Sequence, residues 1–135
     1  MSNELNKEKL TAFIRGTLGC GCPDEVFETI ESSRIAVGAL PGAATRIVVG
    51  DTLLLYVVAP ASIQELADTI AEVADSGRRD RDANRYNRFR LVVSDDSDEG
   101  GRAGAVAGFA REVGSDKKMH IHFVDAATIL GLYEA

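Results

Sequence analysis

The chain has 135 residues, a net charge of −6 and two cysteines. That length suits one domain over residues 1–135, with a core large enough to fold without a metal or a disulfide. The acidic balance disfavours nucleic acid and anionic membranes as partners of the whole surface, and no apolar run approaches the roughly 20 residues of a membrane span. Segment 1–7 is polar and charged, unlike a secretory signal, which predicts a cytoplasmic protein with reduced thiols.

The first half of the chain predicts a pair of helices followed by a β-hairpin. Apolar residues at three- and four-residue spacing indicate the helices, and β-rich runs on either side of Gly50-Asp51-Thr52 indicate the hairpin. Its first strand should form an antiparallel edge of the sheet. The expected elements are helices over 6–18 and 23–30, a short strand over 33–40, and hairpin strands over 46–49 and 53–58.

Helices and strands alternate in the second half of the chain. The expected elements are a helix over 62–74, an Arg-rich connector over 78–85, a strand over 89–94, a helix over 102–113, a strand over 119–124 and a last helix over 126–133. Ser62 and Glu65 form a capping box for the first of these helices, and Gly77 is expected to end it. The inward face of the helix over 102–113 should consist of Ala103, Val106, Ala107, Ala110 and Val113.

This alternation predicts an α/β fold. Right-handed βαβ crossovers would bring the strands over 53–58, 89–94 and 119–124 together as the parallel strands of a three-layer βαβαβ core. The resulting sheet would be mostly parallel, with the antiparallel hairpin at its edge and the helical pair at the N-terminal end of the chain.

Cys20-Gly21-Cys22-Pro23 is the sharpest local motif. A thiol at a helix N-terminus meets the positive end of the helix dipole, which favours the thiolate, and a second thiol can resolve an oxidised first one or bind a soft metal. Asp24 and Glu25 place negative charge in the same turn and oppose this effect. Catalysis by Cys20 and Cys22, metal binding by both thiols, and a structural helix corner are therefore the alternatives.

The second motif is His120-Ile121-His122, which contains the only two histidines of the chain. Residues i and i+2 of a strand point the same way, so both imidazoles should share one face, a spacing that can chelate a metal. If this strand adjoins the cysteine motif, His120 and His122 would complete a tetrahedral set with Cys20 and Cys22 for zinc or iron. The alternative is an edge strand with a wetter face.

A third cluster lies where the expected parallel strands end, the edge of α/β sheets at which ligands usually bind. Three carboxylates there can hold Mg²⁺: Asp96, Asp98 and Asp125. Val57-Val58-Ala59-Pro60 and the run 92–98 resemble the Toprim domain of topoisomerases and primases over about half of the chain. Ala59 stands where that family has a catalytic Glu, so the resemblance implies a degenerate Mg²⁺-dependent, phosphate-handling domain. The alternative is that these acids cap the following helices.

The segment from Arg78 to Arg90 concentrates positive charge. It contains six arginines and two aspartates, so its net charge is +4 in an otherwise acidic chain. Tyr86 and Phe89 are interleaved with them, so that a ring of a ligand can stack there. This composition suits contact with an anionic partner, and the alternative is a solvated helix end.

Three function classes follow from these motifs. The first is a thiol-redox or metal-binding protein that uses the cysteine motif, with zinc or iron as its metal. The second is a non-enzymatic module that binds an anionic partner through residues 78–90. The third is the Mg²⁺-dependent, Toprim-like domain. Whether the chain is an enzyme stays open, and a protein partner or a second copy of the chain is the expected kind of association.

Overall fold

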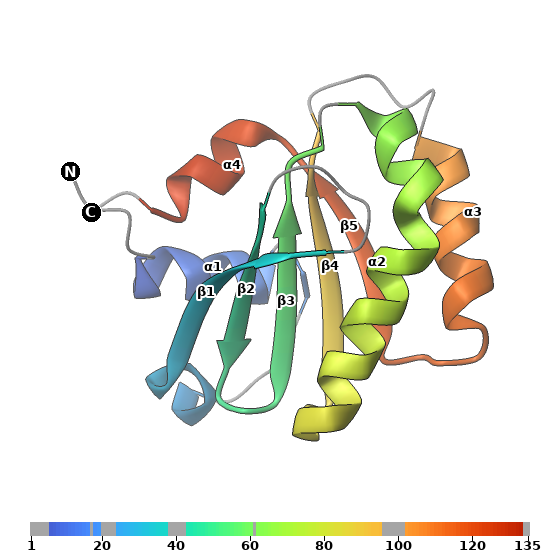
Figure 1. Cartoon of the computed structure of the whole chain (residues 1–135). Coiled ribbons are helices and arrows are strands. Elements are labelled where there is room, and N and C mark those ends of the chain that lie inside the picture. Colours follow the sequence, from blue (N-terminus) through green and yellow to red (C-terminus); the bar gives the residue numbers. More distant parts are fainter. Residues whose placement is uncertain are drawn as a thin grey trace.

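The computed structural model describes residues 6–16, 18–19, 24–37, 43–60, 62–95 and 102–133 (Figure 1). The elements in chain order are α1 (Lys7–Gly16), the 3-10 helix η1 (Asp24–Glu28), β1 (Ile30–Ala36), β2 (Ala43–Val49), β3 (Leu53–Val58), α2 (Ile63–Asn84), β4 (Arg88–Ser94), α3 (Arg102–Val113), β5 (Met119–Val124) and α4 (Ala126–Gly131). The expected α/β class is confirmed. Within the described ranges no helix combines the length and the apolar character that crossing a membrane requires.

The five strands form one mixed sheet in the order β1-β2-β3-β4-β5. The pairs β1–β2 and β2–β3 are antiparallel, whereas β3, β4 and β5 run parallel to one another. α2 connects β3 to β4 and α3 connects β4 to β5, and the two helices pack against each other on one side of the sheet (Figure 1). Every residue of β3 is buried, as expected for a strand that is covered on both faces.

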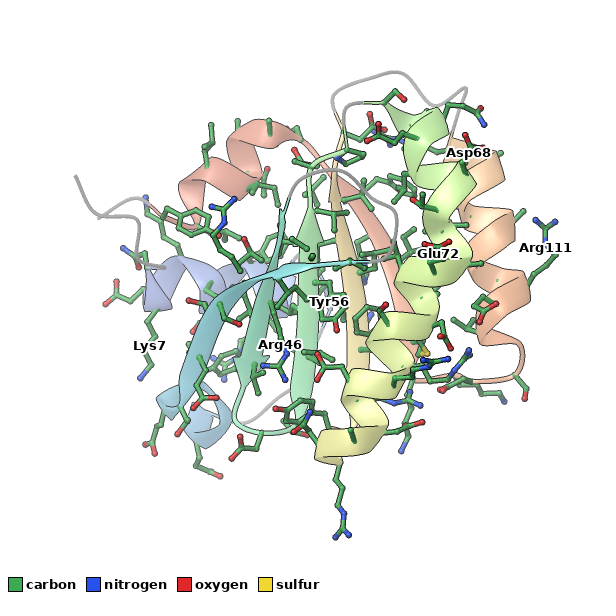
Figure 2. The ribbon with its side chains drawn as sticks, viewed as in Figure 1. Lys7, Arg46, Tyr56, Asp68, Glu72 and Arg111 are labelled. Carbon is green, nitrogen blue, oxygen red and sulfur yellow. The ribbon has the colours of Figure 1, made fainter. Side chains whose placement is uncertain are left out.

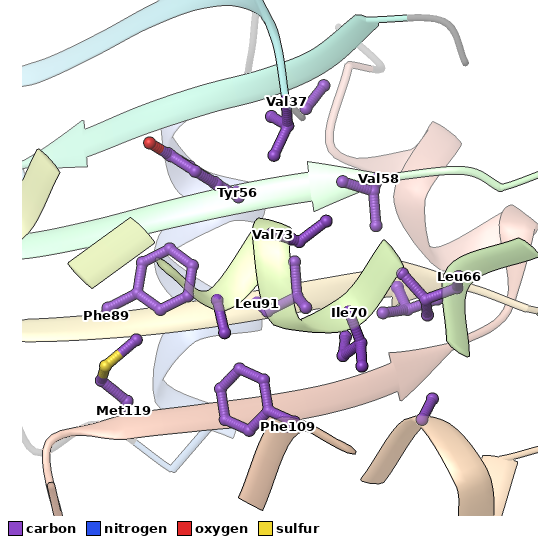
Figure 3. Packing of buried hydrophobic residues seen from close by; sticks show 14 of the residues in the cluster. Val37, Tyr56, Val58, Leu66, Ile70, Val73, Phe89, Leu91, Phe109 and Met119 are labelled. Carbon is purple, nitrogen blue, oxygen red and sulfur yellow. The ribbon is translucent and has the colours of Figure 1, made fainter. Parts of the chain in front are cut away.

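Buried apolar side chains form one cluster on each face of the sheet. The first cluster lies between the sheet and the helices α2 and α3, and the rings of Tyr56 and Phe89 meet in it edge to face, with their centroids 5.0 Å apart (Figure 3). The second cluster lies on the opposite face and contains residues of α1, of η1 and of the chain after α4. Its members include Leu10, Ile14, Phe27, Leu55, Val92 and Leu132.

The N-terminal part differs from the expectation. The segment expected to be a helix over 23–30 contains only the five-residue helix η1, and Ile30 already begins β1, so the expected pair of N-terminal helices is not confirmed. β1, rather than the first hairpin strand, is the antiparallel edge of the sheet. The short strand expected over 33–40 overlaps β1 at residues 33–36. Apolar residues occur only near the two ends of β1, in Ile-Glu-Ser-Ser-Arg-Ile-Ala, so no alternation indicates that the strand begins at Ile30.

The expected helix stop at Gly77 is wrong. α2 continues to Asn84 and ends at Arg85, which has a left-handed backbone with φ of 60°. A Cβ atom at Gly77 would lie 2.4 Å from Cζ of Phe89, so glycine is required here for close packing of the helix on β4. The expected Arg-rich connector is therefore largely helical.

The expected inward face of α3 is also wrong. The buried residues of α3 are Ala105, Gly108 and Phe109, whereas Val106 is 43% exposed. A Cβ atom at Gly108 would lie 2.5 Å from Cγ2 of Ile70 in α2. The close approach of the two helices at this glycine, together with the bulk of Phe109, determines which face is buried.

Candidate functional site

Four of the predicted site residues lie outside the described part of the chain: Cys20, Cys22, Asp96 and Asp98. Thiol chemistry and Mg²⁺ binding through them stay predictions. Of the described residues near the cysteine motif, Leu18 and Phe27 are buried in the second cluster, whereas Gly19 and Glu25 are exposed. η1 is a short 3-10 helix, so the dipole expected to favour a thiolate is smaller than that of the α-helix expected over 23–30.

Asp125, the third predicted Mg²⁺ ligand, is the N-cap of α4. Its carboxylate accepts hydrogen bonds from the hydroxyl of Thr128 and, at 2.8 Å, from the backbone N–H of Thr128, and the two bonds in that order lower the pKa of Asp125. Asp95, at the end of β4, pairs with Nε of Arg102 at 2.7 Å. Over the described ranges, no three His, Cys, Asp or Glu side chains group in a way that could hold a metal ion.

Half of the predicted Arg-rich segment is engaged in ion pairs within the fold. Arg78 contacts Glu112 of α3 at 2.7 Å, and Arg81 contacts Asp116, in the loop before β5, at 2.6 Å. Arg79, although its side chain is 80% exposed, contacts Asp75 at 2.9 Å. The pairs of Arg78 and Arg81 join α2 to α3 and to the loop before β5, whereas the Arg79–Asp75 pair lies within α2. The alternative of a solvated helix end fits the exposed Arg79 but not Arg81, which is buried.

A basic depression of about 390 Å³ lies at the end of α2. It is lined by Arg81, Asp82, Arg85, Tyr86, Asn87 and Lys118. Two of its cationic groups already have partners, because Arg81 pairs with acids and Nζ of Lys118 donates to Asn87 at 2.9 Å. This depression is therefore the weaker of two concentrations of positive charge.

The stronger concentration of positive charge lies where the histidine pair of β5 and the end of the Arg-rich segment on β4 are adjacent. Residues i and i+2 of a strand share a face, and Arg90 of β4 lies opposite His120 of β5 in the register of the sheet. One face therefore carries Arg88, Arg90, His120 and His122, and we call these four residues the basic face. It adjoins the second cluster, because Val92 lies on the same face of β4.

Arg90 has an unusual environment. It is only 7% exposed, and its Nη1 donates to Nε2 of His122 at 3.0 Å. Its Nε is buried without a hydrogen-bond partner, and none of the ion pairs among described residues involves Arg90. Burial first, and then the positive charge of Arg88, lowers the pKa of Arg90. Among the described residues, this buried cation therefore has no counter-charge.

His122 is held in its neutral form. Burial, followed by the charges of Arg90 and His120, lowers the pKa of His122 from 6.5 to about 4. Because a guanidinium can only donate, Nε2 of His122 must be the acceptor in the contact with Arg90, and its lone pair is then in use. The neighbouring positive charges and this occupied lone pair favour an anion over a metal cation at the histidine pair.

The contact between Arg90 and His122 is not among the features expected from the sequence. The sequence does contain a signal, since Arg88 and Arg90 alternate with buried residues on one expected parallel strand and the histidines alternate on the next. Comparison with known proteins does not assign the site: no protein-family model, no curated protein and no solved structure matches this chain.

Proposed function

We propose that this chain is a non-enzymatic binding module that takes up an anionic ligand at the basic face. One observation carries the proposal: Arg90 is 7% exposed and has no carboxylate partner among the described residues. Burial of an uncompensated guanidinium costs several kcal/mol, and a bound anion would offset that cost. Arg46 and Arg81, by contrast, each hold a carboxylate.

The surroundings support a binding role for this face. We infer a three-layer arrangement, in which α1 and the residues after α4 cover the second cluster on the face opposite α2 and α3. The basic face lies on β4 and β5, next to the second cluster that these segments cover. Arg88 and His120 are exposed, so an anion in solution meets them first, while Arg90 and His122 lie deeper.

The test is calorimetric titration of the full chain at low ionic strength, with acetate and inorganic phosphate as probes. Affinity should fall as the ionic strength is raised, and Arg90→Gln should weaken binding by about tenfold or more, the usual loss when a charged hydrogen bond is removed. Arg111→Gln is the matched control, because Arg111 extends into solvent from α3 on the other side of the sheet (Figure 2). Binding of neither probe, or equal losses in both variants, would contradict the proposal.

Thiol-redox or zinc or iron binding through Cys20 and Cys22 is a second candidate function. Its support is the burial of Leu18 and Phe27, which lie a few residues from the motif in the chain, in the cluster that adjoins the basic face.

A further inference from the structure

A second arginine of the sheet shows what a half-buried guanidinium of this chain does when an acid is available. Arg46 of β2 binds Asp80 side-on: its Nε lies 2.7 Å from Oδ2 and its Nη2 lies 2.8 Å from Oδ1. The hydroxyl of Tyr56 donates to the same carboxylate at 2.7 Å, and Figure 2 shows Arg46 and Tyr56 on neighbouring strands beside α2. The Nε and Nη2 atoms form the edge of a guanidinium that matches the two oxygens of a carboxylate.

In Arg90 that same edge is unused. Its Nη1, on the other side of the group, is held by His122, while Nε is buried without a partner and Nη2 makes no hydrogen bond with the described residues. Because His122 fixes one end of the planar group, the orientation of the unused edge is set before any ligand arrives. Such preorganisation reduces the entropy lost on binding. A carboxylate reaches Nε only when the atoms that cover it move aside, since Nε is closed to solvent in this structure.

Charge balance selects the class of anion. The buried guanidinium of Arg90 is balanced by one negative charge. His122 adds no charge because it is neutral, and the charge of the exposed Arg88 is screened by water. A dianion would carry surplus negative charge next to Leu55 and Val92, which are fully buried apolar residues. A planar monoanion with two oxygens therefore fits this edge better than a phosphate dianion.

We propose that the ligand of the basic face is a carboxylate, bound side-on by Nε and Nη2 of Arg90 while His122 holds Nη1. This inference rests on the proposed function and names its ligand class. His122 is a positioning residue in this arrangement, because it touches Arg90 and does not touch the ligand.

The decisive variant is Arg90→Lys, which keeps the charge and removes the two-donor edge. Acetate should bind the wild-type chain more tightly than inorganic phosphate does, and Arg90→Lys should bind acetate at least tenfold more weakly while its phosphate affinity changes little. Arg111→Lys is the matched control and should retain acetate binding, because Arg111 extends into solvent from α3, away from the basic face (Figure 2). If Arg90→Lys binds acetate like the wild-type chain, or if phosphate binds more tightly than acetate, the carboxylate inference is wrong although anion binding stands.

A measurement on the wild-type chain covers the case in which the variant does not fold. The Nε–H group of Arg90 gives its own signal in ¹⁵N–¹H NMR, and this signal should shift during titration with acetate until the site is saturated. An Nε–H signal that stays in place while calorimetry detects acetate binding would overturn the side-on geometry. If neither acetate nor phosphate binds, this inference and the proposed function are both wrong.

Discussion

Acidification should remove a defined part of the stability of this fold through His122. Burial, Arg90 and His120 lower the pKa of His122 to about 4, whereas the same ring in the unfolded chain titrates near its ordinary value of 6.5. Between these two pH values the unfolded chain therefore binds one more proton than the folded chain. The free energy of unfolding must consequently rise with pH across this window, and the contribution of His122 is lost as the pH falls from 6.5 to 4.

The size of the effect follows from the gap between the two pKa values. A difference of about 2.5 corresponds to at most about 3.5 kcal/mol, at about 1.4 kcal/mol for each unit. Since the ring of His122 is only partly buried, screening by water reduces the expected loss to about 1–2 kcal/mol. His122→Gln keeps an acceptor for Arg90 and cannot titrate, so it should lose less stability than the wild-type chain on acidification, by that amount.

Two measurements check this prediction. NMR titration of the His120→Gln variant follows His122 as the only imidazole of the chain, and its midpoint should lie well below 6.5. Urea unfolding at pH 7 and pH 4.5 compares the wild-type chain with His122→Gln, which cancels the contribution of carboxylates such as Asp80. An imidazole midpoint at or above 6.5, or equal losses of stability in both proteins, would refute the reasoning.

Three further predictions concern packing, buried charge and the thiols. Gly77→Ala should destabilise the fold by about 1–3 kcal/mol in urea unfolding, because the methyl group meets the ring of Phe89, whereas Gly16→Ala, with open space around it, should not destabilise it. Arg90→Met should leave the free energy of unfolding unchanged or raise it, by up to about 2 kcal/mol, because it removes a buried charge; a clear loss would show that Arg90 is mainly structural. Cys22 should be alkylated faster than free cysteine at pH 7, and an unshifted pH–rate profile in metal-free protein would make the motif structural.

The elements that sequence patterns predict well are those whose signal is local. Leu53–Val58 and Met119–Val124 are strands at the expected residues, because a continuous apolar run and an alternating run each point to a strand. Ser62 caps α2 and Asp125 caps α4 as expected, since a capping side chain bonds to a backbone N–H only three residues away.

The elements that sequence patterns predict poorly depend on partners distant in the chain. The sequence around Gly77 looks the same whether this glycine ends a helix or makes room for a ring. The structure shows the second case, because the ring of Phe89 on β4 packs against Gly77. The buried face of α3 depends in the same way on Ile70 of α2. β1 pairs along its whole length with β2 but has no apolar alternation, so the sequence indicates a strand over 33–40 and misses its start at Ile30.

The candidate site shows the same limit in chemical terms. Two histidines at alternate positions of a strand can bind a metal if their lone pairs are free. The local sequence does not indicate that one of these lone pairs is occupied. The register of β4 on β5 changes this, because it brings Arg90 within 3.0 Å of His122, occupies a lone pair and adds positive charge. Arg46 and Arg81 show that this chain supplies carboxylates to half-buried arginines elsewhere. Arg90 instead contacts an imidazole and has no carboxylate partner among the described residues. A buried cation without a counter-charge favours anions, which is the physical basis of the binding function that we propose.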